Sequence, residues 1–256
     1  TNSQNVDLNR NFTKNNFTSE NSDYKTLHNF FTPKAYKGSK TANVRFYASV
    51  ANLIRKHGAA TLKKAILLGQ KSLKQGLYFS GTTTQNEAQY LLDEMQVNIS
   101  NIQKVIWVDC HSGYGPKYQM SIVNSRFEKS QTKQLKESMK YPLILGLEEN
   151  DFYDVEGDMI EKIYQIHKET NSSSLLYATC FEFGTLGEST KNNIESLKAM
   201  MFENSLFFNN QSEKFKSYAR NLIYEQFLPS EAKWREKAES DFLLAITGIL
   251  EFFHFM

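Results

Sequence analysis

Two short stretches of the sequence place residues that can do acid–base or metal chemistry at the end of an apolar run. In the first, Asp109 and His111 close the run that begins at Val105. Side chains alternate along a strand, so Asp109 and His111 are expected to point to the same face. A carboxylate behind a histidine fixes the imidazole tautomer for metal binding or for proton transfer. The alternative is a polar strand end with a solvated histidine.

In the second stretch, Glu182 lies between Phe181 and Phe183, near the end of the run that begins at Leu175. Burial of a carboxylate without a partner costs several kcal/mol or forces the group to stay neutral. Glu182 therefore has a cation beside it, or it is a carboxyl group whose pKa has been raised for proton transfer. A structural salt bridge is the alternative to a catalytic role.

The two runs themselves predict the elements that position these residues. Each is short, nearly continuous and rich in β-branched and aromatic residues, which is typical of a strand buried on both faces of a parallel or mixed sheet. Glycine follows soon after each run, as Gly113 and Gly184, and ends the strand. Open α/β sheets hold ligands at the carboxyl ends of their strands. We therefore predict that His111 and Glu182 face one crevice.

A third candidate lies near the amino terminus, where Asn9 and Arg10 form a compact cluster of hydrogen-bond donors. A guanidinium can grip a carboxylate with two parallel hydrogen bonds, and an adjacent amide can add another. The alternative is a surface turn with a solvated arginine.

The rest of the chain alternates helical and strand patterns, which predicts an α/β fold with a mixed, mainly parallel central sheet flanked by helices. Lys191 to Met256 reads as three helices and forms a helical carboxyl-terminal tail. Further helices are expected at residues 41–58, 61–70, 84–95 and 158–170, and further strands at 118–123 and 143–145.

The composition of the chain limits the classes of partner that we expect. The net charge of +2 argues against nucleic acid or an anionic membrane as a partner. No window approaches the roughly 18 consecutive apolar residues of a membrane span. Cys110 and Cys180 lie in apolar runs, so we expect core thiols and no disulfide. No signal peptide is visible, but the chain does not begin with Met, so the compartment stays open, with the cytoplasm favoured. Oligomeric state is not indicated.

Three segments, taken in order, carry a resemblance to a known family. They are residues 6–12 (VDLNRNF), residues 109–116 (DCHSGYGP) and residues 181–185 (FEFGT). With them the sequence resembles the zinc carboxypeptidase family, in particular its branch of uncharacterised bacterial carboxypeptidase-like domains. The likeness covers most of the chain to about Thr185. It implies a single carboxypeptidase-like α/β domain over residues 1–256, with a sheet core at 1–190 and the helical tail at 191–256.

The resemblance implies a zinc-dependent hydrolase that cleaves a terminal peptide or amide bond. His111 matches the family's third zinc ligand, and Asp109 would orient it. Glu182 matches the catalytic glutamate, which acts as general base on a zinc-activated water. Asn9 and Arg10 match the segment that holds the terminal carboxylate of the substrate.

A tyrosine usually closes over the substrate in this family. Tyr153 is the candidate for that role, because it precedes Gly157 and a helix as in the family pattern, and Tyr114 and Tyr118 compete with it. Tyr114 is also expected to contact the substrate. The partner implied is a peptide or an N-acyl amino acid with a free carboxylate.

One departure from the family pattern concerns the other two zinc ligands. The family takes them from an H-x-x-E motif upstream of the Asn-Arg segment, and none of the five histidines here has Glu three residues later. A catalytic zinc needs three protein ligands and an open position. We expect the chain to be the downstream portion of a longer protein, without its amino-terminal strands and with the remaining ligands upstream of Thr1. The alternatives are a metal-free relative that binds carboxylate ligands without catalysis, and an N-acyl amino acid deacylase of the same fold.

Overall fold

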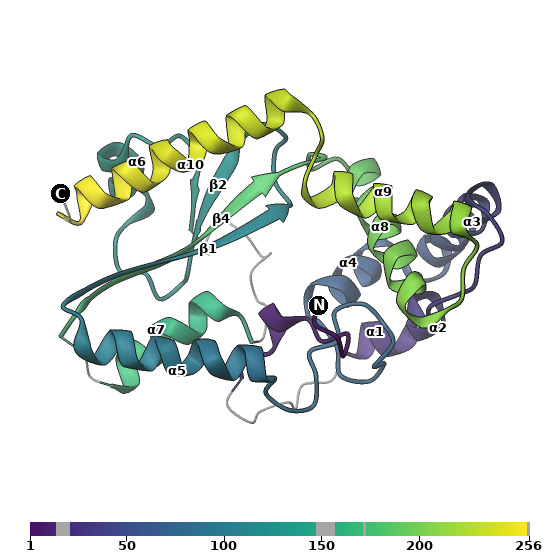
Figure 1. Ribbon diagram of the computed structural model, residues 1–256, viewed down its shortest axis with the longest axis horizontal. Coiled ribbons are helices and arrows are strands. Elements are labelled where there is room, and N and C mark those ends of the chain that lie inside the picture. The colour runs from purple at the N-terminus through teal and green to yellow at the C-terminus, as the bar shows by residue number, and fades with distance from the viewer. Residues whose placement is uncertain (14–20, 147–156, 171–172, 255–256) are drawn as a thin grey trace. The chain divides into compact units, whose positions relative to one another are not determined.

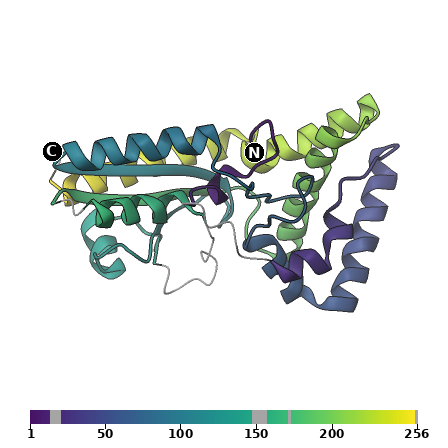
Figure 2. The ribbon, with the colours of Figure 1, turned by 90° about the horizontal axis from the view of Figure 1, so that it is seen from below.

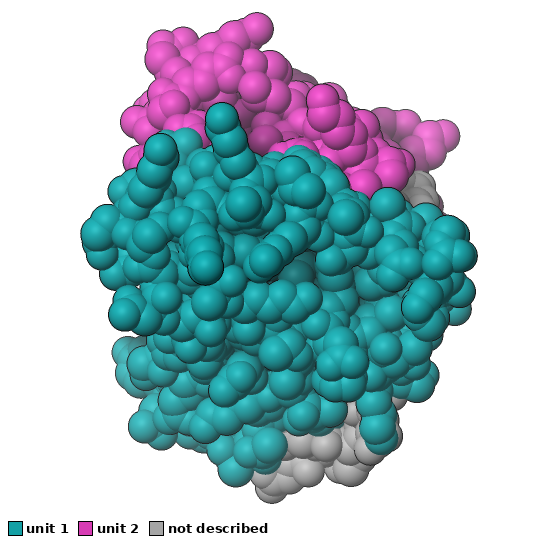
Figure 3. Space-filling view, turned by 90° about the vertical axis from the view of Figure 1, so that its right-hand side faces the viewer, with its two compact units in different colours: residues 1–93, 154–159, 197–223 teal, residues 94–153, 160–196, 224–256 magenta. Residues whose placement is uncertain are grey.

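The computed structural model describes residues 1–13, 21–146, 157–170 and 173–254 (Figure 1). The chain divides into two compact units, coloured separately in Figure 3. Unit 1 consists of residues 1–93, 154–159 and 197–223, and unit 2 of residues 94–153, 160–196 and 224–256. The single carboxypeptidase-like domain expected over residues 1–256 stays a prediction.

Unit 1 is built from helices around an aromatic core. Tyr24 stacks on Phe31 with ring centroids 4.3 Å apart, and Phe202 lies between Phe46 at 5.9 Å and Phe215 at 5.4 Å. All five rings are buried. The first segment of unit 1, residues 1–93, contains η1 (Leu8–Arg10), α1 (Ser22–Thr26), α2 (His28–Phe31), α3 (Ser39–His57), α4 (Ala59–Leu67) and the first half of α5 (Asn86–Asn101).

The sequence explains where the long helix α3 ends. Phe46, Val50 and Leu53 recur at helical spacing and are buried on one face. Gly58 follows with φ of 83°, a conformation that stops the helix and that glycine adopts without strain. His57 is therefore the last residue of this helix.

Unit 2 holds the sheet, which has the strand order β1-β4-β2-β3. The strands are β1 (Lys104–Gly113), β2 (Met120–Asn124), β3 (Ile144–Leu145) and β4 (Leu175–Gly184). The β1–β4 and β2–β3 pairs are parallel, and the β2–β4 pair is antiparallel. The predicted α/β class, with a mixed and mainly parallel sheet between helices, is confirmed.

The two faces of this sheet differ in their cover. Tyr177 and Phe181 of β4 pack on Leu135 and Met139 of α6 (Thr132–Met139) and on Ile249 of α10 (Ala232–Phe252). The opposite face is covered by α7 (Met159–Glu169) and by residues 94–101 of α5, which lie side by side in Figure 2. Because side chains alternate, residues 180 and 182 point away from the α6 and α10 layer.

The predicted helical tail forms α8 (Thr190–Phe208), α9 (Glu213–Phe227) and α10. The last of these packs on the sheet and fixes its strand ends. Trp234 donates its indole N–H to the carbonyl of Gly184 at 2.7 Å, and the backbone N–H of Met120 donates to Asp241 at 3.1 Å. In unit 2 the last helix of the tail is therefore part of the core.

Two expectations about β1 are wrong. The strand lies at the edge of the described sheet and is only half-buried, whereas β4 is buried along most of its length. An apolar run predicts burial but not the number of neighbouring strands, so β1 and β4 read alike in sequence. For the same reason Cys110 is exposed on β1, and only Cys180 is a buried thiol.

Among the described residues, no helix combines the length and the apolar character that crossing a bilayer requires.

Candidate functional site

The parallel pairing of β1 with β4 brings the two sequence-predicted residues together. His111 and Glu182 are direct partners in register, at the carboxyl ends of adjacent strands. The imidazole Nδ1 of His111 lies 3.8 Å from a carboxylate oxygen of Glu182. The prediction that these residues face one crevice required this juxtaposition, although 71 positions separate them in the sequence.

Asp109 holds the other ring nitrogen of His111. Its carboxylate lies 2.8 Å from Nε2, so Nδ1 is left facing Glu182. Burial alone lowers the pKa of His111, but the hydrogen bonds to Asp109 and Cys180 outweigh it, and the net shift is upward. The surroundings therefore favour positive charge on or beside the ring.

Glu182 is almost fully buried, with 6% of its surface exposed. The backbone N–H of Tyr114 donates to its Oε1 at 3.1 Å and so orients the carboxyl group. Burial raises the pKa of Glu182 to about 7, although His111 and the Tyr114 N–H oppose the shift. A carboxyl group with a pKa near neutrality is suited to accept and release protons.

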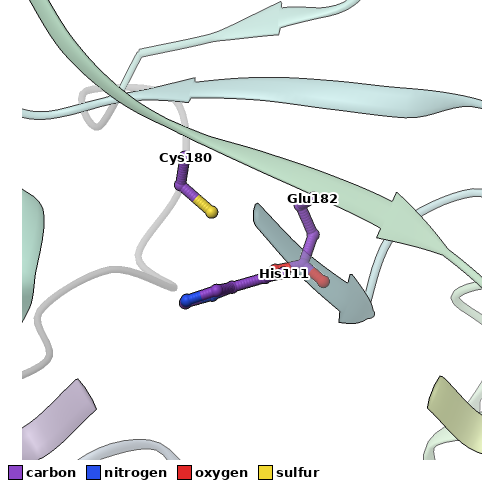
Figure 4. A group of neighbouring side chains, drawn as sticks. All are labelled: His111, Cys180 and Glu182. Atoms are coloured by element: carbon purple, nitrogen blue, oxygen red, sulfur yellow. The ribbon is translucent and has the colours of Figure 1, made fainter. Parts of the chain in front are cut away.

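Cys180 joins this cluster, which the sequence analysis missed. One nitrogen of His111, the Sγ of Cys180 and one carboxylate oxygen of Glu182 lie within 4.8 Å of one another. Figure 4 shows Cys180 and Glu182 projecting from the same strand toward the imidazole. Burial raises the pKa of the Cys180 thiol to about 11. The available signal was the two-residue spacing of Cys180 and Glu182, which puts both on one face of a strand.

Ser121 is a second residue that the sequence analysis missed. It pairs directly with Glu182 across the antiparallel β2–β4 ladder and is 1% exposed. Its hydroxyl has no hydrogen-bond partner among the described residues. A serine inside the otherwise apolar run from Met120 to Val123 was the signal in the sequence.

Asn9 and Arg10 belong to unit 1, as do Asp7, Tyr78 and Met159, which they contact. A guanidinium nitrogen of Arg10 lies 2.6 Å from Asp7, and the guanidinium carbon is 4.7 Å from the centre of the Tyr78 ring. Asn9 accepts from the backbone N–H of Met159 at 3.3 Å, at the start of α7. A shared site for these residues with His111 and Glu182 stays a prediction.

The three tyrosine candidates differ in where they lie relative to Glu182. Tyr153 lies outside the described residues. Tyr118 donates its hydroxyl to Glu231 at 2.6 Å. Tyr114 is half-buried, and its pKa is raised by burial and by the nearby carboxylates of Glu188 and Glu182. Of the described candidates, Tyr114 is the one with both its backbone and its side chain beside Glu182.

The donor set at the end of β1 and β4 suits a zinc ion. Imidazole nitrogen, thiolate sulfur and carboxylate oxygen are the three ligand types that zinc takes from proteins. Asp109 on Nε2 of His111 is the outer carboxylate that usually orients a ligating histidine. His111 and its neighbours therefore fit the metal that the resemblance implies.

Comparison with known proteins places the chain in a family. No curated protein and no solved structure matches the chain. A family model described as "Protein of unknown function (DUF2817)" matches residues 1–241. Because that match spans most of the 256 residues, the chain belongs to the DUF2817 family.

Proposed function

We propose that the protein is a zinc-dependent hydrolase that cleaves a terminal peptide or amide bond. The observation that carries the proposal is the pairing of His111 with Glu182 at the ends of two parallel strands, with Asp109 on the far ring nitrogen. The three segments that resemble zinc carboxypeptidases support it, since His111 and Glu182 occupy the positions of the third zinc ligand and of the catalytic glutamate.

A bound zinc ion would polarise the scissile carbonyl and lower the pKa of the attacking water toward ~7. His111 would hold it through Nδ1, because Asp109 already occupies Nε2. Asp109 fixes the ring in the tautomer that leaves the Nδ1 lone pair available.

Glu182 carries the proton in this proposal. Its carboxylate accepts a proton from the attacking water while the oxygen of that water bonds to the carbonyl carbon. It then delivers the proton to the amine nitrogen as the C–N bond breaks, which leaves a carboxylate and an amine as products. The Tyr114 N–H on Oε1 orients the carboxyl group for both transfers.

Chelation tests the metal requirement. The protein is assayed with a panel of short peptides and N-acyl amino acids, each with a free α-carboxylate. We expect hydrolysis that a chelator abolishes and that added Zn²⁺ restores. A rate unchanged after complete removal of metal would contradict zinc catalysis. Cleavage of N-acyl amino acids but not of peptides would identify the deacylase variant of the same chemistry.

Arg10 is proposed to grip the free carboxylate of the substrate. We expect Arg10→Lys to raise KM for substrates with a free carboxylate by about 10- to 100-fold, because the paired hydrogen bonds are lost while the charge stays. For the matching amidated substrates KM should not change. Asp7→Asn removes the charge of one internal partner of Arg10 and serves as the control for its internal contacts. An equal effect of Arg10→Lys on both substrate series would exclude this role.

The metal-free alternative retains one supporting observation. Among the described residues, His111 is the only histidine in a cluster of potential metal ligands. In that case the protein binds carboxylate ligands and the chelation experiment finds no metal and no turnover. Binding of a free α-carboxylate, measured by calorimetry and lost in Arg10→Lys, would then describe its activity.

A further inference from the structure

Cys180 is the member of the cluster that the proposed mechanism does not use. It is 3% exposed, and it lies directly beside Asp109 in the β1–β4 register, two residue pairs before His111 and Glu182. Its sulfur, a nitrogen of His111 and an oxygen of Glu182 lie within 4.8 Å of one another. Figure 4 shows its thiol projecting toward the imidazole and the carboxylate, so it is placed to act together with them.

The orientation of the His111 ring decides which of its nitrogens can bind a metal together with Cys180. Asp109 occupies Nε2, so Nδ1 is the ring atom that faces the rest of the cluster. Ligand atoms around a tetrahedral zinc ion are about 3.5 Å apart, given its bond lengths to nitrogen and sulfur. Shifts of about an ångström or less bring atoms within 4.8 Å to that spacing.

We propose that Cys180 is a metal ligand, and that its thiolate and the Nδ1 of His111 bind one divalent, thiophilic ion from adjacent strands. The proposal rests on the metal of the proposed function but not on its hydrolytic chemistry. A coordinating thiol loses its proton to the ion's field, so burial of Cys180 is no obstacle. The thiolate also reduces the charge of the ion, and Glu182 keeps its role as base with Oε1 held by Tyr114.

Cobalt(II) tests this assignment, because a thiolate bound to cobalt gives an intense charge-transfer band in the near ultraviolet and nitrogen or oxygen ligands do not. The chain offers a matched control in its two cysteines, exposed Cys110 and buried Cys180. We expect the band in the unmodified protein titrated with Co²⁺. It should persist in Cys110→Ser, which keeps Cys180 as the only cysteine among the 256 residues.

In Cys180→Ser we expect the band to vanish and the affinity for Co²⁺ to fall by at least about tenfold, the lower end of what loss of even an outer partner costs. The Cys110→Ser result stands by itself if Cys180→Ser fails to fold. If the band appears but the protein hydrolyses no substrate, Cys180 is supported as a metal ligand and the proposed function is contradicted.

Three outcomes overturn the ligand assignment. Co²⁺ bound without the thiolate band shows a metal held by other atoms, and it leaves the proposed function intact. A protein that binds no Co²⁺ overturns the assignment and the zinc mechanism together. A band lost in Cys110→Ser but kept in Cys180→Ser would place the thiolate ligand on the wrong face of β1.

Discussion

Replacing Glu182 by Gln is expected to reduce kcat by about 10²- to 10⁴-fold, the usual contribution of a positioned general base. The amide has nearly the same shape and its oxygen can still accept from the Tyr114 N–H, so the fold should be retained. It cannot accept the proton of the attacking water at neutral pH. The measurements are kcat on the peptide panel and zinc content by elemental analysis, in the same preparation.

The metal content gives this variant its diagnostic value. If the variant keeps its zinc but loses activity, Glu182 is the base. If it loses both zinc and activity, Glu182 is a ligand. Glu188→Gln is the matched control, because it removes an exposed carboxylate six positions further along the same segment. Full activity in Glu182→Gln would remove Glu182 from the mechanism.

Replacing His111 by Gln is expected to have the largest effect on metal binding, a loss of affinity of more than about 100-fold, because loss of an outer partner alone costs 10- to 100-fold. The amide is a much weaker donor to zinc than an imidazole nitrogen. Isothermal titration with Zn²⁺ measures the change, and the charge-transfer band of the cobalt form should be lost with it.

Two further variants calibrate that loss. Asp109→Asn leaves the ligand in place but weakens its orientation, so it should cost 10- to 100-fold, less than His111→Gln. His57→Gln changes an exposed histidine at the end of α3 and should cost nothing. Equal affinities for all three variants and the unmodified protein would show that the metal, if bound, is held elsewhere.

Local chemistry made part of this site predictable from sequence. Strand alternation is a property of the backbone, so Asp109 and His111 could be assigned to one face without coordinates. An isolated carboxylate inside an apolar strand is costly, and this singled out Glu182. Each inference needed only residues a few positions apart.

Properties that depend on pairing could not be predicted in the same way. The apolar runs of β1 and β4 look alike, yet one strand is at the edge of the described sheet and the other is central. Cys180 was interpreted as a core thiol because its neighbour across the ladder is unknown until the register is known. The packing of α10 on the sheet depends on Trp234 and Asp241, whose partners are more than 40 residues away.

Arg10 illustrates a different limit. Its type and position next to Asn9 indicate a carboxylate grip, and the same features serve equally well for an internal ion pair. The contact with Asp7 at 2.6 Å and the Tyr78 ring under the guanidinium show that internal contacts are made. A guanidinium has five N–H donors in a fixed fork, so the contact with Asp7 alone does not decide between the two roles. The comparison of free-carboxylate substrates with their amidated counterparts in Arg10→Lys separates the two roles.

The unbroken ten-residue alignment of β1 with β4 has a consequence for how this family can vary. Deleting or inserting one residue between Val105 and Cys110 would rotate His111 to the other side of the strand while Glu182 stayed in place. Amino-acid exchanges on the α10-facing side of β1 do not change the side to which His111 points. Length changes before the histidine should therefore be excluded in active members of the family, whereas changes of residue type along the same strand should be tolerated.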